Sequence, residues 1–313
     1  ETLCIPDVYS IDKSASYSFD STFDRKSGYT TKSMLTFPLS NLNGEVLGVL
    51  QMINPLDKKC AVTVFTEEDQ LYITHFASSA SIVLQRAQMT RSMVLRMIQM
   101  AELRDPKETG PHVNRVASYS VEIYEKWARN RGIAEDVIEK TRDSLKIAAM
   151  LHDVGKVAIS DAILKKPARF TDDEYTIMKS HTFLGARLFA SKHSVLDEIS
   201  CDVALMHHEN WDGTGYPGYI DLETGKAIRK NLKGEPLPRK GEEISLFGRI
   251  VSIADVFDAL SSKRVYKKSW DENDVLNEIA QLSGSKFDPE LVEVFFEVYD
   301  IIKSIQNKYP DIE

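Results

Sequence analysis

Two adjacent histidines, His207 and His208, open the polar segment HHENWDGTGYPGYI at residues 207–220. Two carboxylates, Glu209 and Asp212, follow them and precede a turn rich in glycine. The segment has no apolar period, which indicates a loop or a helix end rather than core. Imidazoles beside carboxylates are typical ligands of divalent metal ions. We therefore expect a metal site here, with a solvated loop of chance composition as the alternative.

Further histidines are placed where they could supply additional ligands. His152 and Asp153 are paired within KIAAMLHDVGKVAI, which we interpret as a helix, and His181 lies in another expected helix. A lone histidine in a helix is more often an ordinary residue, so each position by itself is weak evidence. Together, five of the seven histidines occupy candidate ligand positions, and we expect His75 and His193 to be ordinary surface residues.

Carboxylates add to this set of candidate ligands. Asp255 lies in the apolar segment SIADVFDAL, where a buried carboxylate would cost free energy unless a metal or another cation neutralised it. Glu108 precedes His112 by four residues, near an expected helix start, so both could reach one ion. The alternative for Glu108 is a solvated surface charge.

The composition of the 313-residue chain limits its class. The length, with 42% hydrophobic residues, suffices for two domains that each have a core. The net charge of −8 argues against binding long nucleic acid, but not against a small nucleotide held by metal ions. Three scattered cysteines form no disulfide framework, so we expect a reducing, cytoplasmic compartment. We expect no membrane span within these residues, because no sufficiently long apolar run is present. Whether a membrane anchor precedes them is left open.

The first part of the chain has the pattern of strands and turns. Residues 33–41 and 45–54 predict two paired strands, and CAVTVF at 60–65 predicts a third, short one. Thr66 and Asp69 predict a capping box that opens a helix. The apolar spacing from 67 to about 104 favours one long helix or two in series, which could pair in a parallel dimer or pack on the chain's own domains.

From residue 101 onward the apolar spacing is helical almost throughout. We expect helices in KIAAMLHDVGKVAI, EYTIMKSHTFLGARLF, LFGRIVSIADVFDALSS, VLNEIAQLS and ELVEVFFEVYDIIKSI. Glycine and proline cluster at 209–241, which predicts loops there. The mixed first part and the all-α second part place a domain boundary between about 90 and 100.

Several phrases of the first part resemble the C-terminal two thirds of a GAF domain, a small-molecule sensing fold. These phrases are IPDVYS (5–10), SMLTFPL (33–39), GEVLGVLQMIN (44–54) and FTEEDQLYITHFASSASIVLQRAQ (65–88). The resemblance implies a GAF-like sensor domain over 1–90, without its first strands and with an unknown ligand. The alternative is a GAF fold used only for dimerisation and signal relay.

The second part resembles an HD-GYP domain, a branch of the HD metal-dependent phosphohydrolases. The resemblance rests on HDVGK, His181, HHENWDGTGYP, ADVFDALSSKRVYKK and SGSKFDPELVEVF, and it covers about 95–305. It implies a multidomain chain: an α+β GAF-like domain with an antiparallel sheet, a long connecting helix, and an all-α HD-type helical bundle over 91–313. HD-GYP members hydrolyse cyclic dinucleotides, chiefly cyclic di-GMP. Open alternatives are 3′,3′-cyclic GMP-AMP as substrate, a mononucleotide phosphohydrolase, and a non-catalytic cyclic dinucleotide receptor.

The same resemblance implies the ligands of the metal centre. It assigns them to His152, Asp153, His181, His207, His208 and Asp255 and, through a three-metal subset of the family, to Glu108 and His112. It implies two or three divalent ions, with His207 and His208 on different ions and with Asp153 and Asp255 bringing the ions close together. Imidazole and carboxylate ligands without thiolate favour Fe or Mn, with Zn as an alternative.

Phosphodiester hydrolysis at such a centre needs an activated nucleophile and neutralised phosphoryl oxygens, which paired metal ions provide. By the resemblance, Asp153 and Lys156 are catalytic, and Lys156 contacts phosphate or protonates the leaving group. We expect a helical turn to place Lys156 on the same face as His152. Arg264 and Lys267 match phosphate-contacting positions of the family.

Four other features complete the expected site. Tyr216 could stack on a guanine or pack in its own turn. We expect Glu209 and Asp212 to accept hydrogen bonds from ligand histidines, and Arg115 to form a structural ion pair. The basic segment 219–239, with an expected hairpin at DLETGKAI, is longer than is usual in the family. It is either a solvated surface excursion or a flap over the cleft.

Overall fold

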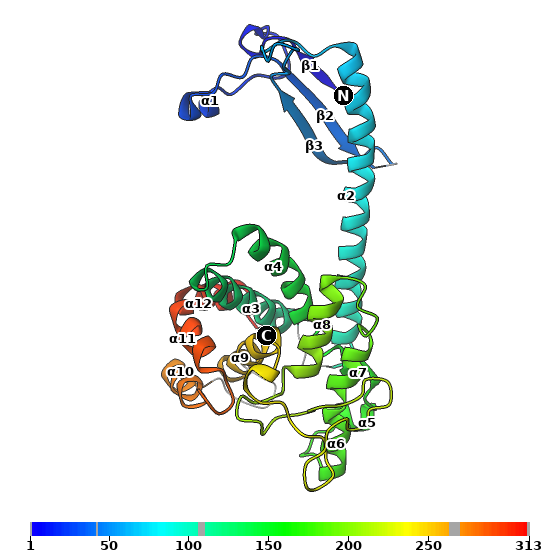
Figure 1. Ribbon diagram of the computed structural model, residues 1–313, viewed down its shortest axis with the longest axis vertical. Helices are drawn as coiled ribbons and strands as arrows, with labels where there is room; N and C mark the ends of the chain where they lie inside the picture. The colour runs from blue at the N-terminus through cyan, green and yellow to red at the C-terminus, as the bar shows by residue number, and fades with distance from the viewer. Residues whose placement is uncertain (1, 42, 106–109, 263–269, 312–313) are drawn as a thin grey trace. The chain divides into compact units, whose positions relative to one another are not determined.

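The structure is a computed structural model that describes residues 2–41, 43–105, 110–262 and 270–311 (Figure 1). The chain forms two compact units, Glu1–Val94 and Leu95–Glu313, hereafter the first and the second unit. Helix α2 (Glu67–Glu102) begins in the first unit and ends in the second. Among the described residues, no helix combines the length and the apolar character needed to cross a membrane.

The first unit contains an antiparallel sheet of three strands in the order β1 (Leu3–Ile5), β2 (Met34–Ser40), β3 (Val46–Ile53). Two short helical segments, η1 (Val8–Ser10) and α1 (Thr22–Ser27), lie between β1 and β2. Alternate residues of β2 point to opposite faces of the sheet. Leu35 and Phe37 are therefore buried together, against Ile73 and Ala77 of α2.

Local sequence signals in this unit are confirmed in part. The paired strands at 33–41 and 45–54 are present as β2 and β3. The Thr66 hydroxyl accepts the Asp69 amide at 3.1 Å, and the Asp69 carboxylate accepts the Thr66 amide at 2.8 Å, which is the expected capping box. The long helix is one continuous element, α2, rather than two in series.

The prediction of a third strand in CAVTVF at 60–65 is wrong. Only an isolated bridge joins Leu56 to Val62. The Asp57 carboxylate accepts the amides of Lys59 and Ala61, so the backbone turns there instead of extending. Cys60 has a φ of 60°, which is also outside the range of a strand.

The regular secondary structure of the second unit, within its described residues, consists of helices that are joined by loops and a few isolated bridges. Its elements are α3 (Gly110–Asn130), α4 (Glu135–Met150), η2 (Val154–Ala158), α5 (Asp161–Leu164), α6 (Asp172–Lys179), α7 (His181–Arg187), α8 (Val195–Met206), η3 (Gly241–Glu243), α9 (Leu246–Ser261), α10 (Glu272–Gln281), α11 (Pro289–Glu297) and α12 (Tyr299–Lys308). The expected all-α character of this part is confirmed.

The core of the second unit lies between the longest of these helices. Helix α3 packs on α4 and α9, and α8 packs on α4, α7 and α9 (Figure 1). Tyr119 of α3, Leu145 of α4 and Phe257 of α9 are buried in this core, and Phe295 of α11 completes it from another side. Packing of these helices fixes the positions of the helix ends, and most candidate ligand residues lie at those ends.

Three helices that the sequence predicts as continuous are interrupted. Helix α4 ends at Met150, α6 and α7 divide at Ser180, and α11 and α12 divide at Val298. The first interruption has a tertiary cause, because the backbone of Gly155 lies against α7. A Cβ at Gly155 would stand 1.9 Å from the carbonyl oxygen of His181, so only glycine permits this approach.

Candidate metal centre

Candidate ligands from five parts of the second unit converge at one place. His112 lies in the first turn of α3, His152 and Asp153 lie between α4 and η2, His181 begins α7, His207 and His208 directly follow α8, and Asp255 lies in α9. The ends of helices thus supply most of the set. Such positions are fixed by the packing of the core, which suits residues that must hold a defined geometry.

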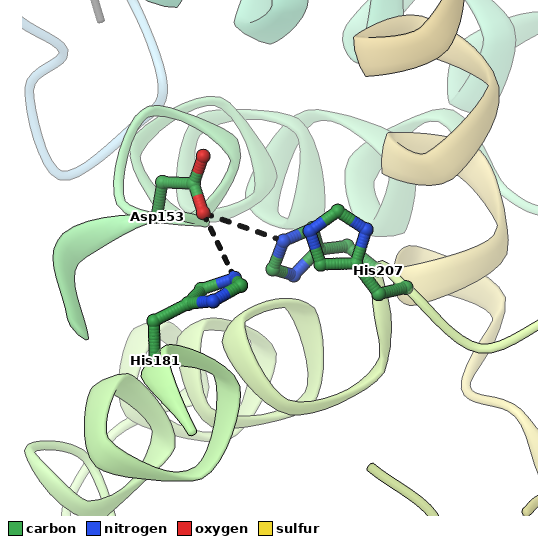
Figure 2. A group of neighbouring side chains, drawn as sticks. Asp153, His181 and His207 are labelled. Carbon is green, nitrogen blue, oxygen red and sulfur yellow. Dashed lines mark ion pairs between the residues drawn. The ribbon is translucent and has the colours of Figure 1, made fainter. Parts of the chain in front are cut away.

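Asp153, His181, His207 and His208 form the first cluster. One possible ligand atom from each lies within 4.8 Å of the others. Figure 2 shows the Asp153 carboxylate pointing at His181 and His207. Oδ1 of Asp153 lies 3.1 Å from Nε2 of His181 and 3.6 Å from Nε2 of His207. His207 and His208 therefore belong to the same cluster, which differs from the expectation that they serve different ions.

His112, His152 and Asp255 form the second cluster, whose possible ligand atoms also lie within 4.8 Å of one another. Nε2 of His112 is 3.7 Å from Oδ1 of Asp255. Asp153 adjoins this cluster too, because its Oδ2 is 3.3 Å from Nε2 of His152. The two oxygens of Asp153 thus face the two clusters, as expected of a residue that brings two ions together.

Hydrogen bonds fix the proton position on three of these imidazoles. Nδ1 lies 2.7 Å from the Ala149 carbonyl oxygen in His152, 2.7 Å from that of Met178 in His181, and 2.9 Å from that of Val203 in His207. A carbonyl oxygen only accepts, so each Nδ1 carries the hydrogen and donates. The lone pair is then on Nε2, the atom that points into the cluster.

This tautomer makes the clusters suitable for cations. The Nε2 lone pairs of His181 and His207 face an oxygen of Asp153, so acceptor meets acceptor in a buried place. Such an arrangement is unfavourable unless a cation lies between the atoms. A donor set of imidazole nitrogens and carboxylate oxygens fits divalent first-row transition metals. The described residues therefore fit a metal centre.

The charge states of the site agree with this reading. Burial alone would raise the pKa of Asp153, but the Lys156 ammonium holds that pKa well below its usual range. Burial lowers the pKa of His207 and of His208. The carboxylate is thus ionised and these imidazoles are neutral at neutral pH, which is the form in which each binds metal.

Lys156 lies beside the centre, although not for the reason given by the sequence. Because α4 ends at Met150, His152 and Lys156 do not share a helical face as expected. Instead, η2 places Nζ of Lys156 2.6 Å from Oδ2 of Asp153 and 3.3 Å from Oδ2 of Asp105. A cation is therefore held directly beside the carboxylate that faces both clusters.

Tyr216 lies against the first cluster. The centroid of its ring is 4.8 Å from that of His208 and 6.5 Å from that of His181. Burial raises the pKa of its hydroxyl, which stays protonated. Both expected roles, packing within the turn and stacking on a base, are compatible with this place, and the substrate-binding role stays a prediction.

The expected roles of Glu209 and Asp212 are wrong. The Glu209 carboxylate accepts the amides of Gly218 at 2.6 Å and Arg239 at 3.2 Å, and the Asp212 carboxylate accepts the Thr214 amide at 2.9 Å. These acids shape the glycine-rich loop and join it to the end of the basic segment. The ligand histidines of α7 and α8 instead donate to backbone carbonyls of their own helical turns, which a sequence pattern does not reveal.

The basic segment 219–239 is folded back on itself. A bridge between Ile220 and Ala227 confirms the expected hairpin at DLETGKAI, and a second bridge joins Lys230 to Pro236. The guanidinium groups of Arg229 and Arg239 lie 4.1 and 4.3 Å from the centroid of the Tyr219 ring. These two cations thus pack within the segment, while a flap function stays a prediction.

Three predicted site residues, Glu108, Arg264 and Lys267, lie outside the described residues. Arg115 forms the expected ion pair, with Asp258. His75 and His193 are exposed, as expected.

Two charged residues beside the site, Asp258 and Lys286, are not predicted from the sequence. Asp258, the second acid of ADVFDAL, is 2.8 Å from Nδ1 of His112. Lys286, in SGSKFDP, donates to Asn210 at 3.3 Å, and its charge interacts with those of Asp255 and Asp212. An acid within an apolar helix was a usable signal for Asp258, whereas Lys286 gives no comparable signal.

Comparisons with known proteins agree with the geometry. Residues 109–260 match the family model described as HD domain. The chain is 32% identical over 268 residues to a "3'3'-cGAMP-specific phosphodiesterase 2" of Vibrio cholerae, covering 85% of this chain and 44% of that protein. It is 36% identical over 223 residues to a "Cyclic di-GMP phosphodiesterase" of Vibrio cholerae (70% and 41% covered). It is 35% identical over 219 residues to a protein of the same name from Thermotoga maritima (70% and 52% covered). The chain thus spans about half the length of these curated relatives.

Proposed function

We propose that this chain, which contains an HD domain at residues 109–260, hydrolyses a cyclic dinucleotide with the help of divalent metal ions. The observation that carries the proposal is the position of Asp153 between two ligand clusters, with imidazole lone pairs directed at its carboxylate. The names of the relatives, phosphodiesterases for cyclic di-GMP and for 3′,3′-cyclic GMP-AMP, support the choice of substrate class.

The residues that would hold the ions are those of the two clusters, with Glu108 as a further ligand. When bound, such ions neutralise the phosphoryl oxygens and activate a water molecule for attack on phosphorus. Two or three ions are proposed, with Fe or Mn preferred over Zn because the donors are nitrogen and oxygen. The neutral His207 and His208 require no deprotonation before binding.

The remaining proposed residues bind or orient the substrate. Lys156, held beside Asp153, supplies a positive charge at the phosphate and a proton for the leaving oxygen. Tyr216 would border a base next to His208. Arg264 and Lys267 would contact the phosphates, as their positions in the HD-GYP motif imply.

The preferred substrate is cyclic di-GMP, which would be cut to the linear dinucleotide pGpG and then, by a second cleavage, to GMP. The alternative substrate is 3′,3′-cyclic GMP-AMP. A non-catalytic receptor is the alternative in another class, and the full set of metal ligands in the sequence argues against it.

We also propose the functions of the two parts of the chain. Residues 91–313 form the HD-GYP phosphodiesterase domain, and residues 1–90 form an incomplete GAF-like sensor domain. The hairpin of β2 and β3 and the helix α2 support the second assignment. A cytoplasmic homodimer that pairs through α2 is the corresponding proposal for the assembly, and the ligand of the sensor is unknown.

Anaerobic purification with metal analysis, followed by product analysis on both cyclic dinucleotides, tests the proposed function. We expect at least two ions per chain and a linear product whose formation stops when a chelator removes the metal. A metal-loaded protein that binds but never cleaves either cyclic dinucleotide would overturn the hydrolase proposal in favour of the receptor.

A further inference from the structure

We propose that Asp258 is a positioning residue for the second cluster. It holds His112 in the tautomer and orientation that direct Nε2 of that imidazole at a metal ion. The inference rests on the proposed function, because it takes the second cluster to be a metal site. It gives a role to Asp258, a residue of the ADVFDAL segment that belongs to neither cluster of candidate ligands.

The two nitrogens of His112 face two carboxylates of one helix. Asp255 and Asp258 lie three residues apart in α9, so both point to the same side of that helix, toward α3. Oδ1 of Asp255 lies 3.7 Å from Nε2 of His112, and Oδ2 of Asp258 lies 2.8 Å from Nδ1. A carboxylate at 2.8 Å accepts a hydrogen bond from Nδ1–H, which leaves the lone pair on Nε2.

Asp258 is itself fixed by Arg115, which lies one turn beyond His112 in α3. Nε of Arg115 donates to Oδ1 of Asp258 at 2.6 Å, and Nη2 donates to Oδ2 at 2.9 Å. The side chain of Asp258 is only 1% exposed, and that of Arg115 only 2%. A buried bidentate pair of this kind holds its carboxylate in one orientation.

The Arg115 guanidinium has further contacts that keep it in place. Nη2 also donates to the Ser262 hydroxyl at 2.9 Å, and Nη1 donates to the Tyr309 carbonyl oxygen at 2.7 Å. Nη1 is in addition 3.0 Å from Oδ1 of Asp311. Helices α3 and α9 and the segment after α12 thus meet around the single group that orients Asp258.

His112 differs in this respect from the other ligands whose Nδ1 contact is defined. His152, His181 and His207 donate to backbone carbonyls, whereas His112 donates to a charged side chain. A carboxylate is the stronger acceptor, and it makes the opposite ring nitrogen a better metal ligand. The orientation of His112 in the second cluster therefore depends on one replaceable side chain, whereas backbone carbonyls orient His181 and His207 of the first cluster.

The substitution Asp258→Asn tests this dependence without relying on turnover. An asparagine keeps the shape, but its amide cannot accept from both His112 and the two nitrogen atoms of Arg115. Loss of a residue that hydrogen-bonds to the far nitrogen of a metal-binding histidine lowers metal affinity by about 10- to 100-fold. We expect Asp258→Asn to bind one ion fewer per chain than the wild type after anaerobic reconstitution with Mn²⁺ and gel filtration, while the first cluster stays occupied.

Ser262→Ala is the matched control, because Ser262 contacts Arg115 in the same network but not His112 in any described contact. We expect it to bind as many ions as the wild type. Equal Mn²⁺ content and equal Mn²⁺ affinity in the wild type and Asp258→Asn would overturn the proposal. An equal loss in Ser262→Ala and Asp258→Asn would also overturn it, because the effect would then be structural.

A second measurement applies if Asp258→Asn does not fold. Ring ¹⁵N NMR of the wild-type protein loaded with Zn²⁺ reports which nitrogen of each histidine carries hydrogen, and His112→Gln identifies the signal. We expect a hydrogen-bonded Nδ1–H for His112, and an unprotonated Nδ1 would overturn the proposal. A wild type that binds metal but cleaves no cyclic dinucleotide would contradict only the proposed function, because both readouts are independent of turnover.

Discussion

At the scale of single residues, the site depends most on Asp153. Its Oδ1 faces His181 and His207, and its Oδ2 faces His152 and Lys156. Its side chain therefore contributes to both clusters and also holds the nearby ammonium. Among the described residues, any other ligand contributes to only one cluster, so Asp153 is the position where one substitution has the widest effect.

We expect Asp153→Ala to lower turnover of a cyclic dinucleotide by at least about 10²- to 10³-fold, because charge stabilisation at the phosphate is lost. The fold should remain, since the core of α3, α4, α8 and α9 is untouched. Steady-state rates, metal content and thermal unfolding check this. Asp143→Ala, at a side chain that is 80% exposed, is the control. Near wild-type turnover with a full metal complement would contradict the assignment of Asp153.

A second prediction at this scale concerns Glu108. We expect the wild type to bind about three ions per chain, as multi-metal phosphodiesterases can, and Glu108→Ala to bind fewer. A weaker site for the linear dinucleotide should impair the second cleavage more than the first. Metal analysis and the ratio of pGpG to GMP measure both effects, with the exposed Glu139→Ala as control. Two ions in both proteins, with identical product ratios, would refute this role.

At the scale of elements, predictions succeed where neighbouring residues determine the structure and fail where tertiary contacts determine it. The hairpin of β2 and β3 and the capping box of Thr66 follow from neighbouring residues, so the sequence reveals them. The end of α4 follows from the contact of Gly155 with His181, and no local pattern contains that contact. The ligand types of the centre are readable from the sequence, because metal binding limits them chemically.

The residues that contact and orient the ligands are harder to predict from the sequence than the ligands themselves. Asp258 meets His112 across 146 positions of the chain, and Glu209 bonds to amides rather than to the histidines next to it. Such partners depend on how helices pack, and a single sequence does not encode the packing in any local spacing. The ligands can therefore be predicted from the sequence, whereas the residues that surround them cannot.

The basic segment gives a prediction at this scale. The segment carries three exposed lysines, Lys226, Lys230 and Lys233, whose charges would attract a dinucleotide, while Arg229 and Arg239 also pack on Tyr219. We expect their joint replacement by glutamine to raise KM by about two- to fivefold at low salt, since exposed charges contribute little each. The value of kcat should not change, because the segment holds none of the proposed ligands.

Lys13, Lys58 and Lys59, which are exposed in the first unit, provide a matched triple replacement as control. KM measured at low and high salt separates charge effects from changes in shape, because salt screens exposed charges. An unchanged KM at low salt would favour a solvated surface excursion over a flap.

At the scale of the whole molecule, every described ligand of the candidate centre lies in the second unit. Helix α2 continues from the first unit into the second and ends three residues before Asp105. Arg104, just past that end, donates to the carbonyl oxygens of Val157 and Ile159, the latter at 2.8 Å. Its Nε is 3.2 Å from Asp161. The end of the connecting helix is thus bonded to the segment that directly follows Lys156.

This connection predicts that Arg104 affects catalysis without touching the metal ions. Removing its three contacts leaves η2 less firmly held, and Lys156 with it. Small displacements of a positioned group can lower rates by about 10- to 100-fold. We therefore expect Arg104→Ala to lower kcat by such a factor while metal content stays at the wild-type value. Arg96→Ala, at an exposed arginine of α2, removes the same charge without these contacts and should leave kcat unchanged. Loss of metal from Arg104→Ala, or an equal loss of kcat in Arg96→Ala, would show that the contacts of Arg104 do not act through Lys156.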